Sequence, residues 1–86
     1  MKVIIYGLDR SRKVIERNLR DNCEIVGYCD DFYKLGTYSD KNLISIDEIK
    51  NIDFDYIIIS SMDKEREEKI RKKLIDIGIE ENKIWK

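Results

Sequence analysis

The chain contains no histidine and no proline. The missing histidine matters for function, because Ser-His-Asp systems, Cys-His nucleophiles and histidine metal sites all need an imidazole. The usual proton shuttle near neutral pH is missing with it. The composition therefore disfavours most enzyme chemistry.

Cysteine is scarce as well, with only Cys23 and Cys29 present. They are six positions apart and do not form a C-x-x-C pair, so neither a zinc site nor a redox motif is supported. The start of the sequence shows no signal peptide, and we expect a reduced, cytoplasmic protein. No apolar run approaches the ~20 residues of a membrane-spanning helix, and no amphipathic basic segment is seen, so we expect no membrane contact.

An excess of charge of either sign is also lacking. Lys+Arg total 17 and Asp+Glu total 18, which gives a formal net charge of -1. Bulk charge therefore gives no reason to expect nucleic-acid binding. With 86 residues, the chain fits a single domain over residues 1–86 and excludes a two-domain enzyme.

The apolar residues are dominated by isoleucine and form three continuous runs. These runs are Lys2–Tyr6, Glu24–Asp30 and Asp55–Ser60. Continuous rather than alternating apolar runs are typical of strands that are covered on both faces, as in parallel sheets. The sequence therefore predicts three buried parallel strands.

Two longer segments between and after these runs have helical patterns. The first covers residues 11–21, with an apolar side made of Val14, Ile15 and Leu19. Its expected polar side contains Arg12, Lys13, Glu16, Arg17 and Arg20. The second helix is expected over residues 63–77 and ends at a left-handed Gly78. The charged run 64–73 inside it is interpreted as a solvated helix face.

The remaining segments predict shorter elements. Residues 31–42 are polar and indicate a loop, and residues 43–44 could add a strand stub. Ser45 and Glu48 have capping-box spacing for a short helix up to about Asn51. A last short strand is expected at residues 83–85.

This order of elements predicts an α/β protein of the Rossmann-like type. Right-handed crossovers and one chain reversal place the first strand in the centre, between the second strand and the 55–60 strand. The expected fold is a three-layer α/β/α arrangement around a small parallel sheet.

A ligand of such a sheet would lie at the carboxyl ends of the strands, where the connections diverge to opposite faces. The candidate binding residues at this edge are Gly7, Leu8, Asp9, Arg10, Ser11, Arg12, Asp30, Asp31, Ser60 and Ser61. The first six occupy the place of a phosphate loop, because they join a strand to a helix N-terminus.

The phosphate loop agrees only in part with a dinucleotide fingerprint. G-x-G-x-x-G would need glycine at 7, 9 and 12, whereas Asp9 and Arg12 stand at the last two positions. A carboxylate ~4 Å from a phosphate charge is repelled by about 4 kcal/mol at an effective dielectric of 20. A helix end returns only ~0.3–1 kcal/mol in most settings. Arg10 and Arg12 could face the anion and reverse the sign, or could pair with Asp9. We favour a structural turn, or a site for a smaller anion, over ordinary pyrophosphate binding.

The other candidates also have two interpretations. Asp30 follows Gly7 by 23 positions, close to the spacing of an acidic ribose ligand, but aspartates also cap turns. Ser60 and Ser61 could contact a ligand, while the spacing of Ser60 and Asp63 favours helix initiation. Trp85 is expected to pack beside the sheet or to mark a partner surface.

Five segments together resemble a known kind of domain. They are KVIIYG at 2–7, EIVGYCDD at 24–31, SIDEIK at 45–50, DYIIISS at 55–61 and LIDIGIEENKI at 74–84. The sequence is similar to the small Rossmann-like N-terminal domain of bacterial polysaccharide-biosynthesis nucleotide-sugar enzymes, of the epimerase/dehydratase and acetyltransferase types. The resemblance implies a nucleotide sugar as ligand, with Asp30 or Asp31 near its base or ribose. The catalytic parts of those enzymes lie in other domains.

We therefore expect a non-catalytic module that binds a nucleotide or nucleotide sugar in bacterial surface-polysaccharide metabolism. One alternative is a docking or dimerisation module that has lost its ligand and uses the sheet edge and Trp85. A second alternative is a fragment of a small NAD(P)-binding oxidoreductase. It is the least favoured, because half a dinucleotide fold with no proton-transfer residue has nowhere to place a substrate.

Overall fold

The computed structural model describes residues 1–8, 11–19, 22–30, 36–38 and 41–85. In chain order its elements are β1 (Lys2–Tyr6), α1 (Ser11–Asn18), β2 (Glu24–Cys29), β3 (Gly36–Tyr38), β4 (Lys41–Leu43), the 3-10 helix η1 (Ile46–Asn51), β5 (Tyr56–Ile59), α2 (Lys64–Asp76), the 3-10 helix η2 (Glu81–Lys83) and β6 (Ile84–Trp85). Within these ranges, no helix is long and apolar enough to span a membrane.

The strands form one sheet in the order β3-β4-β2-β1-β5-β6. The neighbours from β4 to β6 are parallel, and β1 lies between β2 and β5. The prediction of a parallel sheet with a central first strand is therefore confirmed. The continuous apolar runs identified these strands because both faces of each strand are covered.

A hairpin at one edge corrects the expected loop over residues 31–42. There, β3 pairs antiparallel with β4 through residues 36–38 and 41–43. Such a short edge strand forms through backbone hydrogen bonds and needs no buried side-chain pattern. Its polar sequence consequently gave no sign of a strand.

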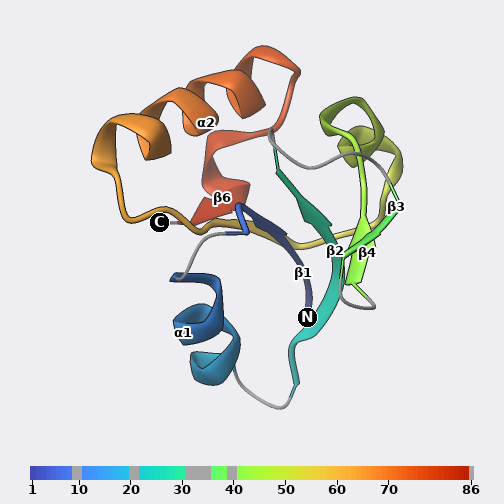
Figure 1. The fold of residues 1–86 in the computed structure, drawn as a ribbon. Coiled ribbons are helices and arrows are strands. Elements are labelled where there is room, and N and C mark those ends of the chain that lie inside the picture. The colour runs from blue at the N-terminus through green and yellow to red at the C-terminus, as the bar shows by residue number, and fades with distance from the viewer. Residues whose placement is uncertain (9–10, 20–21, 31–35, 39–40, 86) are drawn as a thin grey trace.

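Helices cover both faces of the sheet, so the molecule has the three expected layers (Figure 1). On one face, η1 and α2 pack on a core that includes Ile4, Tyr6 and Ile57. On the other face, Ile15 and Leu19, which come from α1 and the residue after it, pack against Ile5 and Tyr28. The layers place α1 and α2 on opposite faces of the sheet.

The side of α1 that faces the sheet differs from the expected one. Val14 is 58% exposed, whereas Arg12 is only 9% exposed. Ile15 and Leu19 pack inward as expected. The assignment of Arg12 and Glu16 to a solvated side was wrong, because these two side chains pair with each other in the layer between helix and sheet.

The helix boundaries follow the capping signals with one change. Asp63 is the N-cap of α2, and its Oδ1 accepts the N–H of Glu65 at 3.0 Å. Ser61 supports this cap, because its Oγ accepts the Asp63 N–H at 3.2 Å. The cap thus uses Ser61 and Asp63 instead of the expected Ser60 and Asp63. Gly78, with φ +104°, follows α2 as expected.

The short helix also begins where expected. The backbone N–H and the Oγ of Ser45 both donate to Glu48 Oε1, at 3.1 and 3.0 Å. The element is a 3-10 helix that extends to Asn51. The side chain of Glu48 thus satisfies the backbone N–H of the N-cap residue Ser45 at the start of this six-residue helix.

Candidate functional site at the carboxyl edge of the sheet

The strand register brings three predicted site residues to the same edge of the sheet. Tyr6 is paired with Cys29 of β2 and with Ile59 of β5. The next residue of each strand is therefore Gly7, Asp30 or Ser60. Because α1 and α2 leave β1 and β5 toward opposite faces, this edge is the topological switch point of the sheet.

Backbone hydrogen bonds hold these strand ends together. Gly7 N–H donates to Cys29 O at 2.7 Å, and Ser60 N–H donates to Tyr6 O at 2.8 Å. Ser60 is 1% exposed. Its place is thus fixed within the sheet, and the half-buried Ser61 is the serine nearer to solvent.

Gly7 cannot be replaced without strain at this position. Its φ is +116°, and a Cβ built on it would lie 2.1 Å from the backbone oxygen of Ser60. A side chain would meet both an unfavourable backbone conformation and a direct clash. The turn after β1 therefore approaches β5 more closely than any other amino acid allows.

Asp30 connects the end of β2 to the turn after β1. Its Oδ2 accepts the N–H of Leu8 at 2.7 Å. The guanidinium of Arg66, in the first turn of α2, lies 3.7 Å from the same oxygen. The side chain of Asp30 is 3% exposed, and that of Arg66 is 28% exposed. Asp30 is thus a buried carboxylate with a backbone donor on one side and a cation on the other.

Arg66 was not among the residues predicted from the sequence, which placed it on a solvated helix face. Two signals could have identified it. The first turn of a helix that follows a parallel strand lies at the carboxyl edge. A cation is also unfavourable near a helix N-terminus, so an arginine there suggests an acidic partner.

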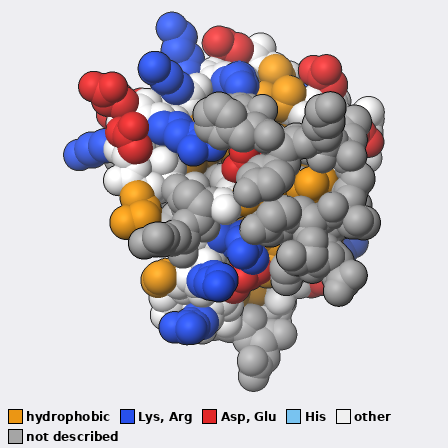
Figure 2. Space-filling view, viewed as in Figure 1, with side chains coloured by type: hydrophobic (Ala, Val, Ile, Leu, Met, Phe, Trp, Pro, Cys, Tyr) orange, Lys and Arg blue, Asp and Glu red, His pale blue; other side chains and the backbone are white. Residues whose placement is uncertain are grey.

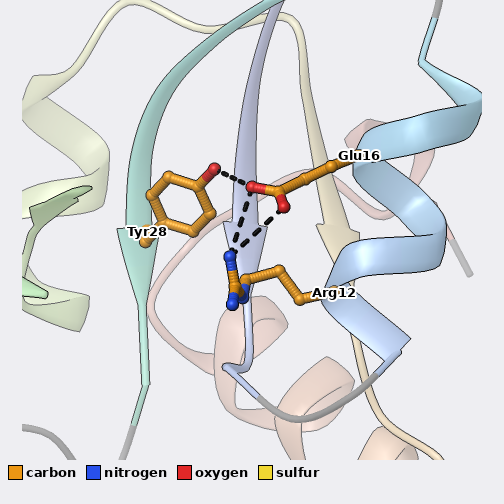
Figure 3. Close-up of polar contacts among 3 residues, drawn as sticks. All are labelled: Arg12, Glu16 and Tyr28. Carbon is orange, nitrogen blue, oxygen red and sulfur yellow. Dashed lines mark hydrogen bonds and ion pairs between the residues drawn. The ribbon is translucent and has the colours of Figure 1, made fainter. Parts of the chain in front are cut away.

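A second polar cluster lies between α1 and the sheet, made of Arg12, Glu16 and Tyr28 (Figure 3). Arg12 Nη1 lies 3.2 Å from Glu16 Oε1, and the Tyr28 hydroxyl donates to Glu16 Oε2. The side chains of Arg12 and Glu16 are 11% and 21% exposed. Burial, and then the hydrogen bond to Glu16, raise the pKa of Tyr28 above its ordinary value. In this cluster, the positive charge of Arg12 compensates the negative charge of Glu16 between α1 and the sheet.

Comparison with known families gives one assignment. A family model described as "C2185-like, N-terminal" matches residues 1–85. The chain belongs to the C2185-like N-terminal family. A comparison with curated proteins gives no match.

In this C2185-like N-terminal domain, the structure brings together Gly7, Leu8, Asp30 and Ser60 as predicted, with Ser61 beside them. Asp9, Arg10 and Asp31 lie outside the described residues, as does the side chain of Ser11. Among the residues that are described, no group of three or more His, Cys, Asp or Glu side chains could hold a metal ion.

A shallow hollow of about 660 Å³ lies elsewhere in the domain, along the exposed side of α2. Its lining residues are Lys64, Glu65, Glu67, Glu68, Lys69, Arg71, Lys72 and Ile75. Charges of both signs are interspersed over this helix (Figure 2). The described part of this lining comes from a single helix, so within the described residues the hollow is open helix surface without the concave walls of a ligand site.

Proposed function

We propose that this domain binds a nucleotide or nucleotide sugar at the carboxyl edge of its sheet, without catalysing a reaction. In this proposal it serves bacterial surface-polysaccharide metabolism in the cytoplasm. The observation that carries the proposal is the switch point itself, where the Gly7 backbone lies so close to Ser60 that a Cβ on Gly7 would be 2.1 Å from the Ser60 backbone oxygen. Open α/β sheets bind ligands in the crevice outside this point. The free thiols of Cys23 and Cys29 fit a reducing compartment.

The described side chains suggest how a ligand would be held. Arg66 is the cation beside the strand ends, and a guanidinium suits the two oxygens of a phosphate. Ser61 Oγ lies at the start of α2, where it both accepts from and donates to Asp63. We assign the phosphate contact to Arg66 in place of Arg12, because the Arg12 side chain is only 11% exposed and lies 3.2 Å from Glu16, whereas that of Arg66 is 28% exposed and its ion pair is longer, at 3.7 Å.

A thermal-shift panel tests the proposal. UDP, UDP-sugars, CMP, NAD and NADP are added to the folded domain, and one class is expected to raise the melting temperature. A ligand at about a hundred times its Kd stabilises by ~2.7 kcal/mol. Arg66→Gln should weaken the response. Arg71→Gln is the matched control, because Arg71 lies five residues further along α2 and pairs with Glu81 at 2.9 Å.

The panel also separates the alternatives. No response to any ligand at millimolar concentration would reject nucleotide binding. A change in NADH or NADPH fluorescence on mixing would favour the oxidoreductase alternative.

A second candidate function is docking or dimerisation, and a specific observation favours it. Trp85 is 40% exposed on the edge strand β6. Its ring stacks on Tyr56 with centroids 4.3 Å apart and planes inclined at 37°. Aromatic residues of this kind are enriched at protein interfaces. Light scattering should then show a dimer that Trp85→Ala dissociates, whereas a strict monomer argues against self-association.

A further inference from the structure

The buried carboxylate of Asp30 lies where a bound phosphate would be expected. Its Oδ2 accepts the Leu8 N–H, the second backbone amide after β1, at 2.7 Å. The guanidinium of Arg66 lies 3.7 Å from that oxygen. Arg66 belongs to α2, which covers the face of the sheet opposite to α1. The side chain is 3% exposed, so water contributes little to its solvation.

A phosphate group needs the same partners as this carboxylate. Backbone N–H groups in strand-to-helix turns and arginine guanidinium groups are the common ligands of phosphate oxygens. Two anions cannot share one N–H and one guanidinium at ~4 Å without strong repulsion, and low solvent exposure strengthens that repulsion. Binding of a phosphate at Leu8 and Arg66 thus requires that the carboxylate leave.

We propose that Asp30 is an internal competitor for the phosphate of a ligand, occupying the anion position formed by Leu8 N–H and Arg66. This inference rests on the proposed nucleotide site and makes it more specific. The affinity for phosphate is low while Asp30 is in place, and it rises when the negative charge is removed. Asp30 also ties β2 to the turn after β1, so its release frees the turn to adjust to a ligand.

The proposal opposes the ribose role that spacing alone suggests for Asp30. A carboxylate that binds a ribose must direct its oxygens toward the sugar. The carboxylate of Asp30 instead points to the Leu8 amide and is shielded from solvent. The two roles predict opposite effects of removing the carboxylate. Loss of a ribose contact weakens nucleotide binding, and loss of a competitor strengthens phosphate binding.

Inorganic pyrophosphate is the probe, with its binding measured by titration calorimetry at constant ionic strength. Asp30→Asn keeps an oxygen that can accept from Leu8 N–H and removes the charge. We expect it to bind pyrophosphate at least about tenfold more tightly than the native domain. Adding Arg66→Gln to this variant should abolish the gain.

Asp55→Asn is the matched control. Asp55 also uses an Oδ2 to accept a backbone N–H at 2.7 Å, from Lys2, but at the opposite edge of the sheet. The same chemical change there should leave pyrophosphate affinity unchanged. Circular dichroism establishes that each variant is folded.

The native domain supplies a second test that needs no substitution. At high pyrophosphate concentration, the amide resonances of Gly7 and Leu8 should shift while that of Lys2 should not. Binding that leaves the Leu8 amide unperturbed would overturn the proposal. So would equal or weaker pyrophosphate affinity in folded Asp30→Asn.

The outcomes distinguish this inference from the proposed function. If the native domain binds a nucleotide and Asp30→Asn weakens that binding, the function stands and the competitor role is rejected. If Asp30→Asn gains pyrophosphate binding but no nucleotide stabilises the native domain, the competitor role stands and the nucleotide proposal is rejected.

Discussion

Gly7 is the residue at which the fold tolerates least change. Gly7→Ala places a Cβ 2.1 Å from a backbone oxygen at φ +116°, and backbone cannot move aside as a flexible side chain can. We expect a loss of about 3 kcal/mol in the free energy of unfolding, measured by urea denaturation.

Gly27→Ala is the control for this substitution. Its Cβ would meet the terminal carbon of the Ile44 side chain at 3.1 Å. That side chain can shift, so the loss should be well below that of Gly7→Ala. Equal losses at the two positions would contradict the assignment of a special role to the Gly7 turn.

Tyr28 donates its hydroxyl hydrogen bond to a carboxylate in a largely buried cluster. Tyr28→Phe removes that donor from Glu16 while keeping the ring. The expected cost is about 2 kcal/mol, because hydrogen bonds to charged groups are stronger than neutral ones. Tyr56→Phe, at a half-buried tyrosine stacked on Trp85, is the control and should cost less.

The same tyrosine should make stability fall at alkaline pH. Burial and Glu16 raise the pKa of Tyr28 above 10.0, its ordinary value. Above that pH the unfolded chain loses the phenolic proton while the folded protein retains it, so the unfolding free energy decreases as pH rises toward the folded pKa. The contribution is fully present below pH 10. Tyr28→Phe should therefore show a shallower decline above pH 10, and parallel curves would refute this coupling.

Residue spacing located Gly7, Asp30 and Ser60 correctly because strand ends in a parallel sheet meet at one edge. It did not identify Arg66 as a partner of Asp30, since their contact joins residues far apart in sequence. Nor did it show that Asp30 is directed to Leu8. The direction of a short side chain depends on local geometry that composition does not specify.

Among the elements, α2 depends on a defined N-cap. Asp63→Ala removes the oxygen that accepts the Glu65 N–H at 3.0 Å and should cost about 1 kcal/mol. Asp76→Ala removes an exposed acid from the last residue of the same helix, where a negative charge is unfavourable. It should be neutral or slightly stabilising in urea unfolding, and a loss as large as that of Asp63→Ala would contradict the cap assignment.

The element α1 shows why a helical pattern can misplace a face. Val14, Ile15 and Leu19 suggested one apolar side, but Val14 is 58% exposed and Arg12 is buried. Besides the apolar contacts of Ile15 and Leu19, the paired side chains of Arg12 and Glu16 lie between α1 and the sheet, where they are only 11% and 21% exposed. Long charged side chains can pack in this way when their charges are matched, and hydrophobicity alone cannot detect the match.

At the scale of the whole molecule, the two faces of the sheet contribute unequally to the core. On the α2 face, the described residues that cover the sheet include the buried Ile70, Leu74 and Ile79, whereas on the α1 face Ile15 and Leu19, which pack on the buried residues of the sheet, are themselves only partly buried. Leu74 is 0% exposed, so Leu74→Ala should cost about 3 kcal/mol. Leu19→Ala should cost less, because Leu19 already contacts solvent. Similar unfolding midpoints for the two variants would contradict this asymmetry.

The central place of β1 also has a consequence for synthesis on the ribosome. One edge of β1 pairs with residues 24–29, but the other edge stays unpaired until residues 56–59 have been synthesised. A nascent chain that has been synthesised as far as η1 therefore carries the apolar strand β1 with one edge unpaired and open to other polypeptides. Pairing with β5 covers this second edge of β1. Even a domain of this size must therefore be synthesised for most of its length before both edges of its first strand are paired.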